Sequence, residues 1–291
     1  MRTFMQRVIG VIIGLALAAS LTTACSAADR PRSEHELVVP LSELSGLALR
    51  TLPGGAQELL AVGDEERTIV AMPIEAGAPN PAKARRIALP MPEVAGGSEL
   101  EGITVDDDGH VWVLVERGEI FVFALEGDRA TELWRKPIVF LPGHPLAAAW
   151  EADSNARAEG LALVGKRILI VKQASPAALI ELIVEPERLV AGQAHELSQM
   201  EDASDLERVG DELFIIGARS ALICAVPIPG QKGPGTSAAL DCRRTWPLPA
   251  NLGKGKTQWE GLAVMSDGRV VVGVDRKKFD RPNIAVIPPL R

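Results

Sequence analysis

A six-residue phrase returns along the 291-residue chain and constrains its fold more than any other feature. In this phrase a polar residue precedes a glycine, and mainly apolar residues follow the glycine. The copies are Leu44–Leu49, Leu100–Val105, Ala158–Leu163, a worn copy at Ser204–Val209, and Trp259–Val264. Their polar residues lie 56, 58, 45 and 56 residues apart. Repeats of about 40–60 residues built from β-type segments are typical of a β-propeller.

Between these copies the sequence reads as strand, turn and strand almost to its end. Asp108-Gly109 and Asp267-Gly268 are hairpin dipeptides between the first and second strands of their repeats. The pattern predicts an all-β, five-bladed β-propeller, with six blades if residues 142–156 contain strands. The fifth repeat ends after three strands, so we expect the N-terminal segment Glu36–Leu41 to supply its outer strand and close the ring.

The first 24 residues read as an export signal. A start carrying Arg2 and Arg7 precedes an apolar run that is short for a membrane span. Leu21–Cys25 resembles a bacterial lipobox, which predicts cleavage after residue 24 and lipidation of Cys25. A tether over 25–35 and a single propeller domain over 36–291 would follow. Cleavage after Ala24 or Ala27, with release of a secreted protein, is the alternative. In lipoproteins an aspartate after the lipidated cysteine often signals retention in the inner membrane. Ser26 stands at that position here, which favours anchoring to the outer membrane on its periplasmic side.

The remaining cysteines, Cys224 and Cys242, are predicted to form a structural disulfide. Each lies in a predicted strand, and a Gly/Pro-rich loop joins the two strands. Neither belongs to a CxxC motif, which disfavours a redox or metal role.

The charge balance bears on possible partners. The net charge is −7, and removal of Arg2 and Arg7 with the leader takes it to −9. An acidic surface argues against nucleic acid. We expect a monomer whose partners are the membrane, through the lipid anchor, and a small anionic ligand or another protein of the cell envelope.

The repeat also places acidic residues at two equivalent positions. The residues before the glycine are Ser45, Glu101, Glu159, Ser204 and Glu260, and the second strands end near Asp64, Glu116, Lys172, Arg219 and Asp275. Antiparallel pairing should bring both sets to the same mouth of the central channel. Carboxylates so close together cannot all stay ionised without compensation.

Three arrangements would provide that compensation. Oxygens of the six predicted ligands can cage Ca²⁺; these are Glu101, Glu159, Glu260, Asp275, Asp64 and Glu116. Lys172 and Arg219 can instead form ion pairs with them, or water can fill a wide mouth. Zinc is disfavoured because no His or Cys shares the predicted site. His144, in the loop between the second and third repeats, is a candidate ligand-binding general base if that loop folds over the mouth, although an ordinary loop histidine is the default interpretation.

The run from Glu260 to Asp275, with its Asp-Gly turn and terminal acid, resembles the "esterase-like activity of phytase" domain and the related SdiA-regulated propeller proteins. The phrases that carry this resemblance are Leu44–Leu47, Leu100–Ile103 and Trp259–Leu262, and it covers most of residues 36–291. The resemblance implies an exported protein, calcium binding and hydrolysis of phosphoesters or carboxylesters. It implies that Glu101, Glu159, Glu260 and Asp275 hold a cation that polarises a phosphate or carbonyl oxygen. Ser45, Ser204 and Lys172 depart from the family's pattern.

Two functions remain open from the sequence. One is an exported, lipid-anchored propeller that binds Ca²⁺ at an acidic mouth and binds or hydrolyses a small anionic ester. The alternative is a non-catalytic scaffold or interaction protein of the cell envelope. A response of the protein's stability to Ca²⁺ distinguishes them, and enzyme activity needs turnover of an ester substrate.

Overall fold

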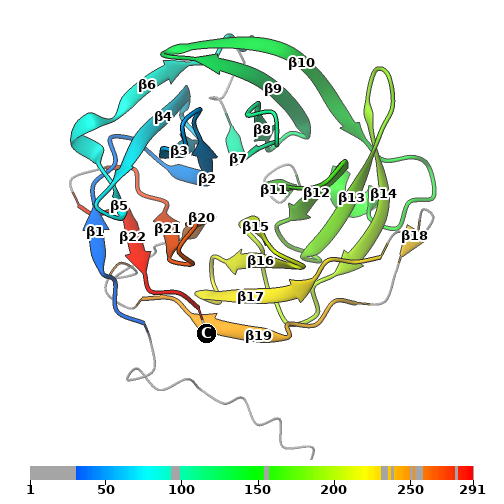
Figure 1. Ribbon diagram of the computed structural model, residues 1–291. Coiled ribbons are helices and arrows are strands. Elements are labelled where there is room, and N and C mark those ends of the chain that lie inside the picture. Colours follow the sequence, from blue (N-terminus) through cyan, green and yellow to red (C-terminus); the bar gives the residue numbers. More distant parts are fainter. Residues whose placement is uncertain are drawn as a thin grey trace, which may run out of the picture.

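The computed structural model describes residues 31–92, 99–153, 157–230, 235–236, 239–249, 252, 258–278 and 281–290 (Figure 1). The predicted leader, the lipidation site Cys25 and the first part of the tether lie outside the described residues. Among the described residues, no helix is both long and apolar enough to cross a membrane.

The described strands form five antiparallel groups around a central axis, which we call blades one to five in chain order (Figure 1). From the axis outward, blade one contains β2 (Leu44–Thr51), β3 (Gln57–Gly63), β4 (Glu66–Glu75) and β6 (Arg85–Ala88), and the short β5 (Ala78–Pro79) also pairs with β4. Blade two contains β7 (Leu100–Val105), β8 (Val111–Val115), β9 (Glu119–Glu126) and β10 (Arg129–Val139). The predicted all-β propeller fold is confirmed.

The third and fourth blades follow the same plan. Blade three contains β11 (Ala158–Val164), β12 (Arg167–Lys172), β13 (Ala178–Val184) and β14 (Leu189–Glu196). Blade four contains β15 (Asp205–Val209), β16 (Glu212–Gly217), β17 (Leu222–Pro227) and β19 (Arg244–Pro247). Two parallel pairings add to blade three: β10 joins β14 through Ile138 and Leu189, and β18 (Gly235–Thr236) joins β14 at its other side.

Blade five joins the two ends of the chain. It contains β20 (Trp259–Val264), β21 (Val270–Val274), β22 (Ile284–Ile287) and, outermost, β1 (His35–Leu37). β1 runs antiparallel to β22, with Glu36 opposite Ala285, and the two lie side by side in Figure 1. The predicted closure by the N-terminal segment is therefore confirmed, although the paired strand begins one residue earlier than Glu36 and ends at Leu37.

The closing strand is held in place by a buried amide. Asn283 is fully buried; its Oδ1 accepts from the Val39 N–H at 2.7 Å, and its Nδ2 donates to the Val39 and Leu41 carbonyl oxygens at 3.0 and 3.3 Å. These bonds satisfy the backbone just past β1, where sheet pairing stops. They fix the N-terminal segment to blade five beyond the three paired residues.

The hydrophobic core is a ring rather than a single centre. Buried aliphatic and aromatic side chains gather in clusters between neighbouring blades, such as Leu60 of blade one with Val113 of blade two. Equivalent clusters lie between blades two and three, three and four, and four and five. A further cluster joins blade five to blade one, as Ile284 packs with Leu59. Each blade is therefore buried on both faces, which explains its continuous apolar strands.

Helices contribute little to the described structure. Residues 142–156, which would have to contain strands in a six-bladed protein, hold the short helix α1 (Ala147–Ala152) and no strand in their described part. A 3₁₀ turn covers Pro81–Lys83. The Cys224–Cys242 disulfide is confirmed, with an S–S distance of 2.07 Å, and it links β17 to the residues before β19.

Candidate functional site

One end of the central channel opens into an acidic cavity of about 220 Å³. All six residues predicted as metal ligands line it. The lining residues are Glu43, Ser45, Asp64, Glu101, Glu116, Glu159, Gln173, Gln258, Glu260 and Asp275. Carboxylates separated by up to 232 residues of sequence, Glu43 and Asp275, thus meet in one hollow. We call this hollow the acidic mouth.

A β-bulge positions the residue that precedes each glycine. Pairing between the first and second strands shifts register between Leu44 and Gly46, between Leu100 and Gly102, and between Ala158 and Gly160. A similar shift follows Trp259 in blade five. A bulge leaves one residue out of the ladder and redirects its side chain. In this way Ser45, Glu101, Glu159 and Glu260 come to face the mouth.

The second acidic set lies one residue beyond the second strands. The amide N–H of Asp64 donates to the Glu43 carbonyl oxygen, and those of Glu116 and Asp275 donate to the Glu99 and Gln258 carbonyl oxygens, each at 2.9 Å. These bonds attach each acid beside the start of its own blade's first strand. The predicted meeting of the two sets at one mouth is therefore found for blades one, two and five.

The prediction for blade three is wrong by one residue. Gln173, rather than Lys172, donates its N–H to the carbonyl oxygen of Arg157 and lines the mouth. Lys172 belongs to β12, where it pairs with Ala158 as Val115 pairs with Leu100. Its side chain is fully buried, and its Nζ donates to the Ala174 carbonyl oxygen. A lysine at the last position of an otherwise apolar strand made the strand look one residue shorter than it is.

Burial and crowding favour the protonated forms of the mouth's acids. Glu101, Glu159 and Glu260 are only 8%, 4% and 8% exposed. Burial, followed by the charges of Glu159 and Glu260, raises the pKa of Glu101 well above its usual range. Burial and the charge of Glu260 likewise raise the pKa of Glu159. The pKa of Glu260 rises to about 8, mainly through burial, although a hydrogen bond from Gln258 Nε2 at 2.9 Å opposes the shift.

The acids nearer the rim are affected in the same direction. Burial, with the charges of Glu99 and Asp64, raises the pKa of Glu116 to about 7. The pKa values of Asp64 and Asp275 are also raised, first by burial and then by the charge of Glu43. One carboxylate oxygen of Asp275, Oδ1, is buried and accepts no hydrogen bond from the described residues.

Little positive charge reaches this cavity from the described residues. The residues that line it include no lysine or arginine. Lys277, whose side chain is 85% exposed, places its Nζ 3.0 Å from Glu43 Oε1 at the rim. Lys172 lies close enough to interact with Asp153 and Glu159, but burial lowers its pKa. Within the described part of the chain, no residue donates a hydrogen bond to the carboxylates of Glu101 or Glu159.

Two other predicted ligand-binding residues lie outside the lining of the mouth. The Arg219 side chain is 69% exposed, with its Nε 3.8 Å from Asp202 Oδ2, and its backbone N–H donates to the same carboxylate. His144 Nε2 lies 2.9 Å from the Gly192 carbonyl oxygen on β14, an outer strand of blade three. The His144 ring also contacts the Phe140 ring edge-on. His144 itself therefore lies against the outer part of blade three and not in the lining of the mouth.

The structure adds residues that sequence reasoning missed. Glu43, Gln173 and Gln258 complete the mouth. The sequence signal for them was their position, three residues before the repeated glycine for Glu43 and Gln258 and directly after a second strand for Gln173. Asp205 takes the glycine's place in blade four and is fully buried at the axis. None of the described residues of blade four lines the mouth.

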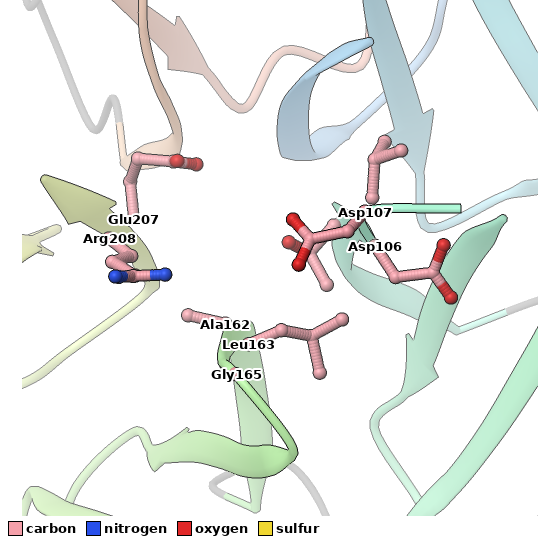
Figure 2. A pocket seen from close by; sticks show the side chains of 9 residues that line it. Asp106, Asp107, Ala162, Leu163, Gly165, Glu207 and Arg208 are labelled. Carbon is pink, nitrogen blue, oxygen red and sulfur yellow. The ribbon is translucent and has the colours of Figure 1, made fainter. Parts of the chain in front are cut away.

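A smaller cavity of about 170 Å³ lies at the other end of the channel. In Figure 2, Glu207 and Arg208 stand on one side of this hollow and Asp106 and Asp107 on the opposite side, with Ala162 at its edge. Burial raises the pKa of Glu207 to about 8. We call this hollow the opposite cavity.

Near the opposite cavity, one oxygen or nitrogen atom from each of Asp106, Asp108 and His110 lies within 4.8 Å of the others. The Asp106 carboxylate already accepts hydrogen bonds from the N–H groups of Asp108 and His110 and from Trp112 Nε1. This cluster therefore has the contacts of a hairpin turn, as its sequence predicts.

Comparison with known proteins supports the fold. No family model matches the chain, and no curated protein matches it. The structure of a glutaminyl cyclase from Myxococcus xanthus is similar over 87% of this chain and 95% of its own, with 13% identity and a TM-score of 0.53. The PQQ-bound aldose sugar dehydrogenase from Streptomyces coelicolor is similar over 88% and 97%, with 13% identity and a TM-score of 0.50. Such low identity establishes a shared fold alone, and the resemblance to the phytase-type family remains a prediction.

Proposed function

We propose that the acidic mouth binds a hard divalent cation of the Ca²⁺ class and, through it, a small anionic ester that the protein binds or hydrolyses. The observation that carries this proposal is the burial of three glutamates from three blades around one cavity. Among the described residues that line this cavity, none is positively charged. Buried carboxylates need protons, counter-ions or a metal. A single cation would compensate the charges of all three glutamates at once.

The donor set fits this class of metal. Every polar side-chain donor in the lining is a carboxylate, an amide or a hydroxyl, and Ca²⁺ prefers six to eight such oxygens. In the described lining residues there is no histidine or cysteine, which zinc and copper sites favour. Among the described residues, only Asp106, Asp108 and His110 already place three potential ligand atoms within 4.8 Å of one another. Glu101, Glu159 and Glu260 would therefore have to draw together around the ion, and Asp64, Glu116 and Asp275 would complete the site.

The residues around the proposed cation suggest how an ester would be bound and hydrolysed. A bound cation polarises a phosphoryl or carbonyl oxygen and offsets negative charge on the ligand. Lys277 projects into solvent at the rim beside Glu43 and would attract an anionic ligand. We therefore propose a metal-assisted hydrolase of phosphoesters or carboxylesters.

Proteins that share the fold give this proposal limited support. A glutaminyl cyclase and an aldose sugar dehydrogenase have similar structures, so propellers of this shape can carry enzyme sites. Fold alone does not fix the chemistry. A scaffold whose mouth carries protonated acids remains the alternative, and the Lys277–Glu43 ion pair at the rim is the contact that favours it.

We also propose that the protein is exported and anchored as a lipoprotein in the cell envelope, through Cys25, and that it acts as a monomer. The leader pattern of residues 1–24 supports export. The Cys224–Cys242 disulfide supports an oxidising compartment. Metabolic labelling with a palmitate analogue tests the anchor, and Cys25→Ser should abolish the label.

Thermal unfolding with added Ca²⁺ tests the cation site. Saturation at about 100 times Kd should add about 2.7 kcal/mol to the free energy of unfolding. The double variant Glu101→Gln with Glu260→Gln should lose this response, whereas Glu126→Gln, at an exposed position on β9, should keep it. A melting temperature that does not respond to Ca²⁺ or to a chelator would favour the scaffold. Turnover of aryl phosphates and aryl acetates, lost in the same double variant, tests for hydrolase activity.

A further inference from the structure

Asp205 interrupts the glycine ring at the axis. Its backbone pairs with Ile216 as that of Gly46 pairs with Val62 and that of Gly102 with Leu114. The glycines are needed because the first strands nearly touch: a Cβ on Gly160 would lie 2.7 Å from the Asp205 Cα. One blade of the five therefore places a carboxyl group where the others have only hydrogen, and this residue is fully buried.

Backbone N–H groups of blades four and five donate to this one carboxyl group, and one of blade one lies near it. Oδ1 accepts the N–H of its neighbour Leu206 at 2.8 Å, and Oδ2 accepts the N–H of Leu262 in blade five at 2.8 Å. The N–H of Leu47 in blade one lies close enough to oppose the rise in the pKa of this carboxyl group. Sheet pairing cannot satisfy these amides, because they face the axis where first strands of different blades meet. A buried carboxyl group with several backbone donors is well satisfied despite its cost of desolvation.

Asp205 also lies between the two cavities of the channel. The acidic mouth is lined at the level of Glu101 and Glu159, one residue before the glycine ring. The opposite cavity begins at the level of Ala162 and Glu207, two residues after it. Asp205, Leu47 and Leu262 line neither cavity. The layer that contains them lies between the levels of the two hollows.

We propose that Asp205 is a positioning residue that joins the first strands of blades one, four and five at the axis, and that it closes the channel so that the acidic mouth is a blind pocket. The carboxyl group fixes Leu47 and Leu262, which follow Ser45 and Glu260 by two residues. It thereby sets where these two side chains enter the mouth. This role goes beyond cation binding and does not depend on it.

Hydrogen exchange at single amides tests the proposal directly. In the wild-type protein, the amides of Leu47, Leu206 and Leu262 should be among the slowly exchanging ones. In Asp205→Ala their exchange should accelerate by about tenfold or more, beyond the change in the rest of the sheets. In Asp205→Asn, the amide bonded to the remaining oxygen should stay protected and the other should not. Such partial rescue is not expected from a general loss of stability.

A matched variant controls for that loss. Ile223→Ala removes a fully buried side chain from β17, the third strand of the same blade, and should accelerate exchange without singling out the three amides. Unprotected Leu47 and Leu262 amides in the wild-type protein, which needs no variant to fold, would overturn the proposal. The same would follow if Asp205→Ala and Ile223→Ala gave the same exchange pattern.

Crystal structures test the closure of the channel. Asp205→Gly gives blade four the residue of the other blades and should open a file of ordered waters between the mouth and the opposite cavity. The wild-type axis should be dry between them. Water in the wild-type axis, or a dry axis in Asp205→Gly, would contradict the sealing role.

Discussion

The hydroxyl group of Ser204 donates a hydrogen bond to the main-chain carbonyl oxygen of Trp259 at 2.5 Å. Ser204 stands at the position in blade four that corresponds to Glu260 in blade five. Its side chain is 1% exposed and joins the two blades instead of entering the acidic mouth. The change from Glu to Ser in the repeat therefore marks a position where a contact between blades replaces a potential ligand.

Ser204→Ala should lower the free energy of unfolding by about 1–3 kcal/mol, because the buried Trp259 carbonyl loses its donor. The matched variant is Ser45→Ala, the equivalent position in blade one. The Ser45 hydroxyl donates to the nearby Glu43 carbonyl at 3.1 Å, a local contact whose loss should cost less. Urea unfolding of both variants measures the difference, and equal losses would contradict the interpretation of Ser204.

The stability of the Ca²⁺-free protein should fall as the pH rises from about 4.5 to about 8. Glu260 and Glu116 have folded-state pKa values of about 8 and about 7, above the usual 4.5 of an unfolded glutamate. In this window the folded state binds more protons than the unfolded state, so the free energy of unfolding decreases with pH. Melting temperatures between pH 4.5 and 8, in the presence of a chelator, measure this slope.

Two variants and one ligand check the origin of that slope. Glu260→Gln should flatten it, whereas Glu126→Gln should leave it unchanged because Glu126 is exposed on β9. Saturating Ca²⁺ should also flatten it if the cation replaces the protons of the mouth. A melting temperature that rises across this window would show that the mouth's acids are ionised and compensated in the folded protein.

The sequence was sufficient to predict the ring and the main carboxylates. The glycine phrase identified Glu101, Glu159 and Glu260, since the same position in equivalent strands must face the same axis. Lys172 was misassigned because strand ends depend on register, and the pairing of Lys172 with Ala158 is visible only in the structure. The position of His144 relative to the mouth depends on the path of its loop, which the composition of the loop does not determine.

Asp205 could not be predicted for a different physical reason. In the sequence it reads only as a substitution of the repeated glycine in the least similar copy of the phrase. Its importance comes from Leu47 and Leu262, which are 158 and 57 residues away and reach it only when the ring closes. Local pattern identifies what a repeat shares, whereas the contacts between blades determine why one copy differs.

The axial glycines should tolerate no side chain. Gly160→Ala would place a Cβ 2.7 Å from the Asp205 Cα and from the Leu206 backbone nitrogen, so the first strands of blades three and four would have to separate. We expect a loss of about 1–3 kcal/mol from such overpacking. Gly230→Ala is the control, since no described atom lies within 4 Å of its added Cβ. Guanidinium unfolding that ranks the two variants equally would contradict close packing at the axis.

Asn283 should control the closure of the ring. Asn283→Ala removes the acceptor of the Val39 N–H and the donor to the Val39 and Leu41 carbonyls in a fully buried place. The unfolding free energy should fall by about 1–3 kcal/mol, and hydrogen exchange in residues 35–41 should rise more than elsewhere, because β1 has only three paired residues of its own. Asn80→Ala, at a surface 3₁₀ turn, should leave that segment protected. If residues 35–41 stay equally protected in Asn283→Ala, then β1 pairing alone closes the ring.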